Sequence, residues 1–307
     1  MVCDKNYLDE HIASIQGAHL YEAAIRQGKK NEYVLRRNIH RLEKGLLMIP
    51  MRDIFGLRFI EETVNCYACI NQLTHPDIHE WGGDVLEEYF KVTESIDPRY
   101  ESSLSNFRQI KREVVGHSLQ LPYIQTYKKT FNYDDLEKVL VSRKSVRWFA
   151  EKAVPSHLIT NSLHLAKLAP SGCNRQPYRY VVTNDPGKSS EIAGVSRGTV
   201  GWSHNVQAVA VLIGRQSAFS GSLNRHSIYI DSTLSVMPFI LALESQGLTT
   251  CIINWVDERH RVDKIKSLVE LKDDERIILS VAIGYARKNT RVAFSRRSAT
   301  ENIYTNL

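Results

Sequence analysis

The first 130 residues carry apolar side chains at helical spacing. Between residues 31 and 48 the apolar positions recur every three or four residues, with charged residues on the other face, which is the pattern of an amphipathic α-helix. Similar patterns predict further helices near residues 59–73, 83–94 and 101–113. The turn-forming residues His75-Pro76-Asp77 and Asp97-Pro98 separate them. We therefore expect residues 1–132 to form a mainly helical N-terminal extension.

From residue 133 onward, short apolar runs alternate with helical patterns. The runs predict strands over residues 180–183, 208–213, 249–253 and 277–284. The helical patterns predict helices over residues 136–142, 156–168, 230–246 and 258–269. Because the strands are continuously apolar, the sheet should be covered on both faces. We expect residues 133–307 to form a single α+β or α/β domain.

Composition and charge narrow the possible partners. The 307 residues are 43% hydrophobic and include 40 basic and 34 acidic residues, a net charge of +6. These charges are interspersed, whereas a nucleic-acid partner would require a concentrated basic face, so a small anionic ligand fits better. The polar N-terminus and the lack of an 18-residue apolar run predict a cytoplasmic protein without a membrane span. No histidine pair has metal-ligand spacing on a predicted helix, so no metal site is expected.

Two polar segments carry the candidate chemistry. Residues 142–147 hold three cations and two hydroxyls in six positions, a combination that suits a phosphate group. Residues 169–178, with the sequence APSGCNRQPY, form a turn-rich run of short polar side chains that leads directly into a predicted strand. Taken singly, the first could be a solvated helix terminus and the second an ordinary turn.

Together, the two segments resemble the signatures of the flavin-dependent nitroreductase family. The family pattern R-x-S-x-R/K-x-F is matched by Arg143, Ser145, Arg147 and Phe149. One predicted helix later, the pattern A-P-S-x-x-N-x-Q-P-W/Y is matched by residues 169–178. Three further segments resemble the family in the same order: residues 241–248, the strand end at residues 253–255, and the last strand with the basic residues 296–297 that follow it. The resemblance covers about residues 135–307.

The resemblance implies a three-layer α-β-α sandwich of the α+β class and a homodimer with FMN at the subunit interface. It implies that the FMN phosphate and ribityl end are held by a basic group of residues: Arg143, Lys144, Ser145 and Arg147, with Arg296 or Arg297. It implies that the flavin is bordered from the partner subunit by a loop comprising Pro170, Ser171, Gly172, Asn174 and Gln176. The turn at Ile253, Asn254 and Trp255 would approach the flavin ring.

The resemblance also implies a reaction. NADH or NADPH would reduce FMN, and reduced FMN would reduce a second substrate, either nitro- or quinone-like or a metabolite that is being tailored. Since the cofactor carries this chemistry, no catalytic side chain is expected. The sequence has no Rossmann glycine fingerprint, so the nicotinamide should bind transiently. The alternative is a non-catalytic or flavin-binding scaffold that retains the nitroreductase fold.

The chain departs from the family pattern in three places. Only about 35 residues separate the strands at 208–213 and 249–253, where many relatives carry a helical cover. Trp255 stands where many relatives have glycine. The N-terminal extension is additional, and its residues 36–46 resemble nitroreductase-like proteins encoded among bacterial surface-polysaccharide genes.

The extension and one histidine supply candidate substrate contacts. Arg37, His40 and Arg41 could lie over the flavin and bind an anionic substrate, or they could form a solvated basic helix face. His204 precedes a strand on the expected substrate side.

Overall fold

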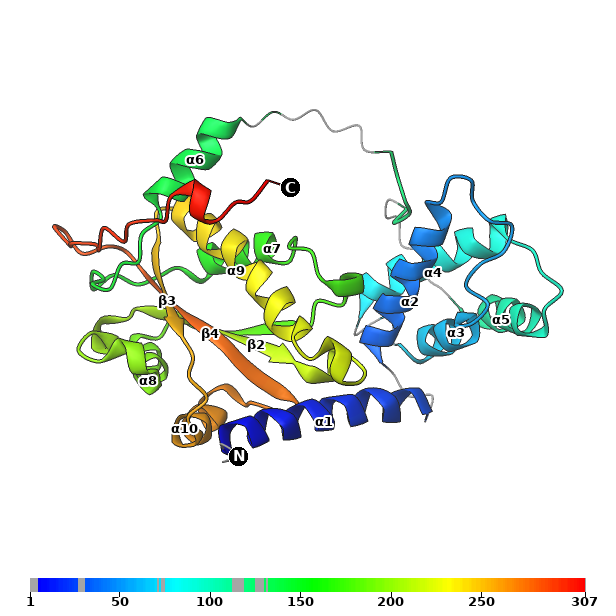
Figure 1. The fold of residues 1–307 in the computed structure, drawn as a ribbon, viewed down its shortest axis with the longest axis horizontal. Helices are drawn as coiled ribbons and strands as arrows, with labels where there is room; N and C mark the ends of the chain where they lie inside the picture. The colour runs from blue at the N-terminus through cyan, green and yellow to red at the C-terminus, as the bar shows by residue number, and fades with distance from the viewer. Residues whose placement is uncertain are drawn as a thin grey trace.

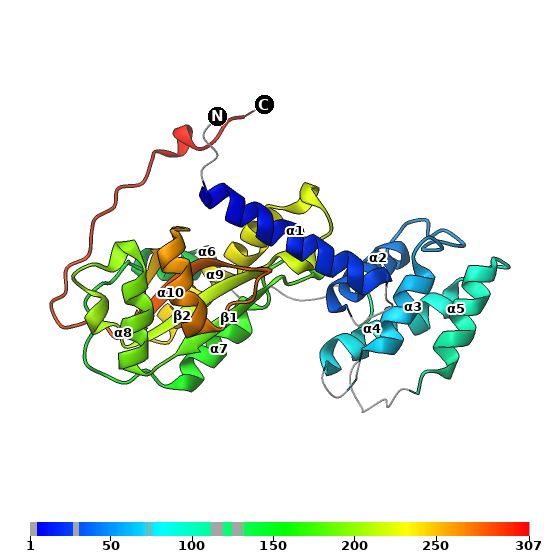
Figure 2. The same cartoon turned by 90° about the horizontal axis from the view of Figure 1, so that it is seen from below.

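The computed structural model describes residues 5–26, 31–70, 72, 75–111, 119–124, 130 and 132–306. Figure 1 shows a sheet domain beside a group of helices from the N-terminal part of the chain. Helix α1 (Lys5–Arg26) runs along the sheet domain, and its C-terminal end reaches the helical group (Figures 1 and 2). The remaining N-terminal helices are α2 (Glu32–Leu46), α3 (Ile60–Cys69), α4 (Pro76–Val92) and α5 (Pro98–Gln109). Helix α6 (Tyr133–Ser142) then leads into the sheet domain.

A four-stranded antiparallel sheet forms the centre of the second half of the chain. Its strands are β1 (Tyr178–Thr183), β2 (Ala208–Arg215), β3 (Thr249–Asn254) and β4 (Glu275–Gly284), in the spatial order β1-β2-β4-β3. The antiparallel pairing resolves the sequence-based alternatives in favour of the predicted α+β class. All four predicted strands are present, and β3 lies at one edge of the sheet.

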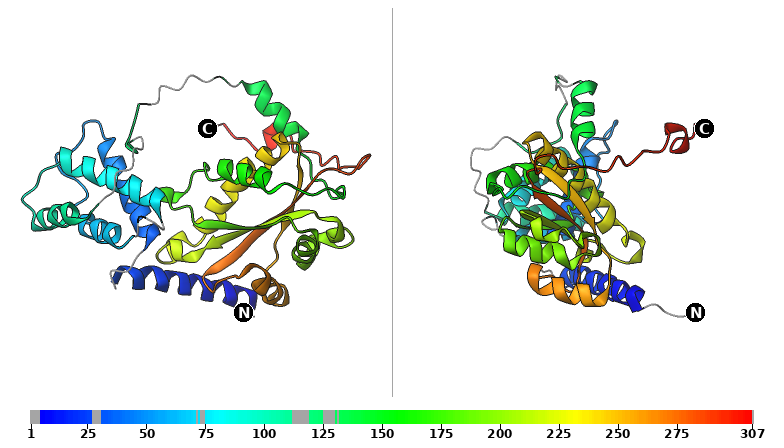
Figure 3. Two further views of the ribbon diagram at one scale, coloured as in Figure 1. Left: turned by 180° about the vertical axis from the view of Figure 1, so that it is seen from behind. Right: turned by 90° about the vertical axis from the view of Figure 1, so that its left-hand side faces the viewer.

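Helices cover both faces of this sheet, as the continuous apolar runs predicted. On β2, Ala208, Ala210 and Leu212 pack toward α7 (Ser156–Ala166) and α9 (Ser227–Ser245). The alternate β2 residues Val209, Val211 and Ile213 pack toward α8 (Pro186–Val195) and α10 (Arg259–Val269). These six β2 residues have no exposed surface. Figures 1 and 3 show the resulting three layers.

Prolines mark helix starts that the sequence analysis placed too late. Helices α4 and α5 begin at Pro76 and Pro98, seven and three residues before the predicted starts. Proline suits the first turn because the missing N–H has no intrahelical partner there. The start of α2 agrees with the prediction, because the Asn31 side chain accepts hydrogen bonds from the N–H groups of Tyr33 and Val34, at 3.0 and 3.1 Å.

The N-terminal helices pack directly on the sheet domain, across the boundary expected at residue 132. Helix α1 runs against the short 3₁₀ helix η4 (Gln216–Ala218). A Cβ atom at Gly17 would lie 2.4 Å from Cβ of Gln216, so only glycine permits this approach. One hydrophobic cluster contains Leu35 of α2 together with Phe219 and Ile228 of the sheet domain. The two parts therefore share a core.

Helix α9 is apolar on two sides. Its buried side faces the sheet, whereas Ile230, Leu234 and Met237 are 58, 45 and 40% exposed. Among the described residues, one helical segment, Ser222–Ser245, has the length and apolar composition of a membrane span. Half of that segment is buried within the protein, as in a core helix of any folded domain, so it is weak support for a membrane span.

A buried carboxylate links the sheet to the N-terminal helices. The side chain of Glu275 is 1% exposed and accepts two hydrogen bonds of 2.8 Å from Arg179 and one of 3.3 Å from Arg215. Arg215 also donates to the Tyr33 hydroxyl on α2, at 2.9 Å. Burial alone would raise the pKa of Glu275, but the hydrogen bonds from Arg179 and Lys272 and the two arginine charges lower the pKa overall.

We expect Glu275→Ala to lower the free energy of unfolding at pH 7 by about 3–5 kcal/mol, because it removes the buried carboxylate that Arg179 and Arg215 share and leaves Arg179 without an ion pair within the ranges that the structure describes. The lowered pKa means that Glu275 contributes stability above its ordinary value of 4.5, and this contribution is lost as the pH falls through the lower folded-state pKa. Urea unfolding at pH 7 and below pH 4.5 measures both effects. The exposed Lys272→Ala is the matched control, and an unchanged stability of Glu275→Ala would refute the assignment.

Candidate functional site

The segment after α6 is fixed along the edge of β3. The Val146 N–H donates to the Thr250 carbonyl at 3.0 Å, and Ser145 forms a parallel bridge with Thr250. Further along, Phe149 forms an antiparallel bridge with Ala286, just beyond β4. Residues 145–149 therefore have a backbone position set by two strands.

Two buried side chains decide which residues of this segment face solvent. Val146 and Phe149 are 4% and 3% exposed. The Phe149 ring packs against Gly284, where a Cβ atom would lie 2.7 Å from the ring. With these two side chains anchored inward, Arg143, Ser145 and Arg147 stay at the surface.

Asn205 completes the anchoring, and the sequence analysis did not single it out. Its side-chain oxygen accepts from the Phe149 N–H at 2.6 Å, and its amide donates to the Arg147 carbonyl at 3.1 Å. Since this contact joins positions 56 and 58 residues apart, no local pattern points to it.

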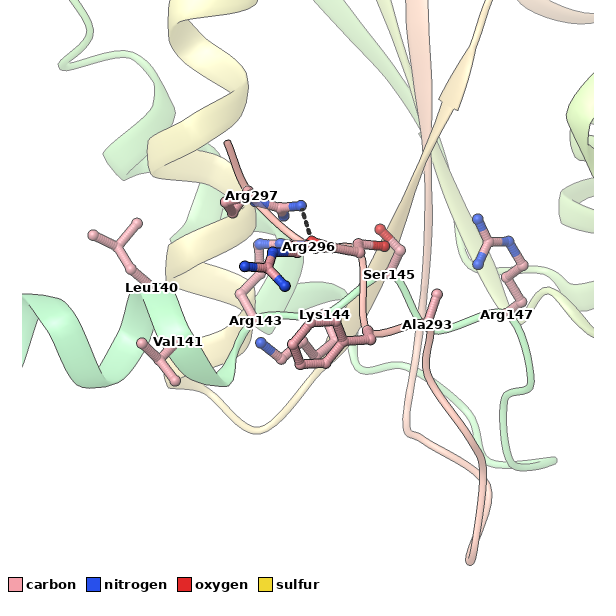
Figure 4. Close-up of a pocket in the computed structure, with 11 residues that line it drawn as sticks. Leu140, Val141, Arg143, Lys144, Ser145, Arg147, Ala293, Arg296 and Arg297 are labelled. Atoms are coloured by element: carbon pink, nitrogen blue, oxygen red, sulfur yellow. Dashed lines mark hydrogen bonds between the residues drawn. The ribbon is translucent and has the colours of Figure 1, made fainter. Parts of the chain in front are cut away.

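The C-terminal segment returns to this surface and closes a cavity of about 340 Å³ (Figure 4). Arg143, Arg296 and Arg297 gather on one side of it, whereas Arg147 lies beyond Ala293, away from them. The lining residues come from α6, the signature segment and the C-terminal segment: Leu140, Val141, Arg143, Lys144, Ser145, Arg147, Ala293, Phe294, Ser295, Arg296 and Arg297. All six residues predicted for the phosphate end therefore line this cavity, although Arg147 is set apart from the other arginines.

The electrostatics of this cavity are one-sided. Five of its lining residues are cations and none is acidic. Within the described part of the chain, none of the five forms an ion pair with a carboxylate; Arg297 donates to the Ser295 carbonyl at 2.6 Å. Burial raises the pKa of the Cys251 thiol on β3, and the charges of Arg147 and Arg143 partly oppose this. Mutual repulsion among the cations would be relieved by a multiply charged anion bound between them.

The loop at residues 170–176 is held in an unusual backbone conformation. Cys173, Asn174 and Gln176 have φ angles of 53, 52 and 51°, in the left-handed region that costs non-glycine residues energy. Side chains stabilise it: the Gly172 N–H donates to Asp231 Oδ2 at 2.9 Å, and the Gln176 N–H donates to Ser171 Oγ at 3.0 Å. Strain of this kind is typical of functional loops.

Asp231 of α9 is the inward anchor of the loop. Burial raises the pKa of this carboxyl, while the Gly172 N–H and the positive charge of Arg175 oppose that rise. Arg175 in turn lies over the Phe219 ring, 4.7 Å from its centroid. None of residues 170–176 lines the cationic cavity, and the loop instead packs next to α2. Within one chain the two predicted groups of cofactor-binding residues are therefore separate.

The residues predicted for the turn near the flavin ring lie at the end of β3. Ile253 and Asn254 are the last two residues of this edge strand, and Trp255 follows them. Ile253 is buried and Asn254 is exposed. The Trp255 indole donates to Asp257 at 2.8 Å and packs on the cluster between the sheet and α10, away from the cationic cavity. The bulky ring therefore does not narrow that cavity.

The candidate substrate residues are placed differently from one another. Arg37 is engaged by the Tyr21 hydroxyl at 2.6 Å, by Asn38 and by Glu62. His40 contacts Glu43 at 3.4 Å. Two other candidates lie on aromatic rings: Arg41 is 3.7 Å from the Phe59 ring centroid, and His204 contacts Trp148 edge to face at 5.8 Å.

Comparisons with known proteins agree with this fold and signature. The model of the nitroreductase family matches residues 140–200 and 195–285. A 4-nitrobenzoate reductase of Pseudomonas putida is 23% identical in an alignment 204 positions long that covers 52% of this chain and 88% of that protein. Iodotyrosine deiodinase 1 of Mus musculus is 22% identical in an alignment 194 positions long that covers 54% of this chain and 67% of that protein.

Among solved structures, a candidate nitroreductase from Bacillus subtilis superposes with a TM-score of 0.51 at 16% identity, covering 57% of this chain and 100% of the other. The second half of this chain is therefore a nitroreductase-like domain.

Proposed function

We propose that this protein is an FMN-dependent oxidoreductase that takes electrons from NADH or NADPH and acts as a homodimer. The cationic cavity is the observation that carries this proposal. It is assembled from residues 140–147 and 293–297, about 150 positions apart in the sequence, and its lining includes five cations without a carboxylate. An arrangement of this kind is stable when a dianion such as the FMN phosphate neutralises it.

The residues present fit the cofactor at the phosphate end. Arg143, Arg296 and Arg297 supply planar guanidinium groups that can each donate two hydrogen bonds to phosphate oxygens. The Ser145 hydroxyl, beside them in Figure 4, is a further donor. Lys144 adds charge at the rim of the same cavity.

The edge of β3 fits the remainder of the cofactor. From Thr250, beside Ser145, to Asn254 the strand extends about 13 Å, at about 3.3 Å per residue. Beyond the bridge to Ser145, no described strand pairs with this outer edge, so its backbone donors and acceptors face outward. Backbone N–H groups next to the ring would favour negative charge on the flavin.

The chemistry that FMN supplies when bound is two-electron transfer from a nicotinamide to a second substrate. The protein's own residues bind and orient: Arg143, Arg296 and Arg297 hold the phosphate, and the β3 edge aligns the ring. The second substrate is proposed to be a nitro- or quinone-like compound or a metabolite. The Pseudomonas relative, a 4-nitrobenzoate reductase, supports a nitroaromatic compound.

The exposed face of α9 supports a homodimer. Ile230, Leu234 and Met237 are spaced four and three residues apart, so they form one apolar stripe on the outside of the domain. A solvent-exposed stripe of this kind is typical of an interface with another chain. Within one chain, the loop at residues 170–176 lies apart from the cationic cavity. A second copy packed on α9 would supply its own loop to the cofactor site of the first.

A flavin-binding scaffold without turnover is the second candidate function. The short connection between β2 and β3 favours it, because a reduced cover leaves the outer flavin face accessible to a partner. Steady-state oxidation of NADH or NADPH in the presence of a nitroarene separates the two candidates: turnover supports the enzyme, and flavin binding without turnover supports the scaffold.

We expect Arg143→Ala and Arg296→Ala each to weaken FMN binding at least about tenfold, since a hydrogen bond to a charged group contributes about 1.5–3 kcal/mol. Arg147→Ala should have a smaller effect, because Arg147 lies apart from the other arginines. Fluorescence titration of the apoprotein with FMN measures the dissociation constants.

Arg291→Ala is the matched control for the FMN titrations, because Arg291 is exposed in the same C-terminal segment but does not line the cavity. Wild-type FMN affinity in Arg143→Ala, or an equal loss in Arg291→Ala, would show that the phosphate is bound elsewhere.

We expect Leu234→Glu to convert the dimer into a monomer, because a carboxylate would be desolvated in the centre of the apolar stripe. Sedimentation velocity measures the change, and Leu234→Met, which keeps the stripe apolar, should remain dimeric. A wild-type protein that is monomeric at micromolar concentration, or a dimeric Leu234→Glu, would contradict the interface.

A further inference from the structure

A second cavity lies wholly within the N-terminal helical extension. It has a volume of about 440 Å³ and lies between the C-terminal half of α2 and the connection to α3. We call it the cationic-aromatic pocket, and its lining residues are Arg41, Lys44, Gly45, Met48, Arg52, Phe55, Gly56 and Phe59. It shares no lining residue with the cationic cavity of the sheet domain.

The positive charges of this pocket are not neutralised by neighbouring acids. In the described ranges, Arg41, Lys44 and Arg52 form no ion pair. Two acids near α2 have other partners: Glu62 binds Arg37 and Asn38, and Glu43 accepts from Trp81 at 2.9 Å. Burial, followed by the charge of Arg37, lowers the pKa of Arg41, and the charge of Glu62 opposes this only in part. An added anion would therefore stabilise the charge of Arg41.

Arg41 is held in an orientation suited to a planar ligand. Its guanidinium carbon lies 3.7 Å above the centroid of the Phe59 ring. Stacking occupies the face of the guanidinium and leaves its N–H groups available at the edge. An oxyanion in the plane of the guanidinium can then accept two parallel hydrogen bonds.

The aromatic wall of the pocket is also fixed. A Cβ atom at Gly45 would lie 2.2 Å from the Phe55 ring, so the absence of a side chain at Gly45 makes room for that ring against α2. Tyr89 fixes Phe55 through two contacts. The two rings pack edge to face with centroids 5.2 Å apart, and the Tyr89 hydroxyl donates to the Phe55 carbonyl at 2.7 Å. The pocket thus combines a rigid apolar wall with three cations.

We propose that the cationic-aromatic pocket binds a small molecule in which an oxyanion, a carboxylate or a phosphate ester, is attached to a planar ring. The ring would pack on Phe55, because Arg41 already covers the face of Phe59. Arg41 and Arg52 would bind the oxyanion. Neither feature alone selects this ligand: an inorganic anion would leave the aromatic wall exposed, and an uncharged ring would leave the cations unpaired.

The position of the pocket connects it to the proposed reaction. Helix α2, which carries Arg41, packs next to the loop that holds Cys173. We assign the bound molecule as the second substrate, and this assignment rests on the proposed function. The binding of the molecule to the pocket is independent of that function.

Isothermal titration of the full chain tests the binding. The probes are 4-nitrobenzoate, phenyl phosphate and uncharged nitrobenzene. Wild-type protein should bind at least one of the two anions, and Arg41→Ala and Arg52→Ala should each weaken that binding at least about tenfold. Nitrobenzene should bind wild type and variants alike.

Arg58→Ala is the matched control, because Arg58 is exposed in the same connection but does not line the pocket. The proposal is overturned if neither anion binds, if both pocket variants bind as tightly as wild type, or if Arg58→Ala loses as much affinity. The FMN absorbance of each variant should equal that of wild type. A variant that loses ligand binding but keeps its FMN absorbance has a defect in the pocket and not in the cofactor site.

Kinetics test the substrate assignment. Arg41→Ala should raise KM for 4-nitrobenzoate about tenfold while leaving kcat and the KM for nitrobenzene unchanged. Lost binding together with an unchanged KM would overturn the assignment as second substrate.

Discussion

The electrostatic repulsion among the cations of the sheet-domain cavity is the constraint on which the site depends. The fold brings Arg143 from the end of α6 together with Arg296 and Arg297 from the C-terminal segment, and it places no carboxylate among the lining residues. Packing holds this arrangement in place, because buried Val146 and Phe149 fix the signature segment against β3 and β4. Packing therefore holds like charges near one another, an arrangement that the proposed FMN phosphate would stabilise.

The N-terminal extension is integrated into the same structure. Gly17 permits α1 to approach η4 closely, and the interactions from Glu275 through Arg215 to Tyr33 join β4, β2 and α2. Because of this packing, α2 lies next to the loop at residues 170–176. The cationic-aromatic pocket in the extension is thus positioned relative to the sheet domain by a shared core.

Apolar spacing and the family motifs predicted those elements whose formation depends on residues close together in the sequence. The four strands and helices α6, α7, α9 and α10 follow from apolar spacing, and six of the residues that line the cationic cavity follow from the family signature. Helix α8 was not predicted, since its apolar positions, Ile192, Ala193 and Val195, do not form a clear amphipathic stripe. The starts of α4 and α5 were placed too late because Pro76 and Pro98 were treated as breaks.

Long-range contacts account for the remaining differences. Arg37 resembles a free cation in the sequence, but Glu62, 25 residues away, binds it. Lys44 and Arg52 became candidates only after the connection between α2 and α3 placed them around Phe55. Asn205 anchors the signature segment from more than 50 residues away. Tertiary packing decides whether a charged side chain is paired or exposed to solvent, and a single sequence does not show that packing.

The visible absorption spectrum of the purified protein, after incubation with FMN and removal of unbound cofactor, tests the central claim most directly. The account predicts a flavin band near about 450 nm that remains with the protein and bleaches when NADH or NADPH is added without oxygen. A protein that retains no flavin band after this treatment would contradict the assignment of the cationic cavity as the FMN phosphate site.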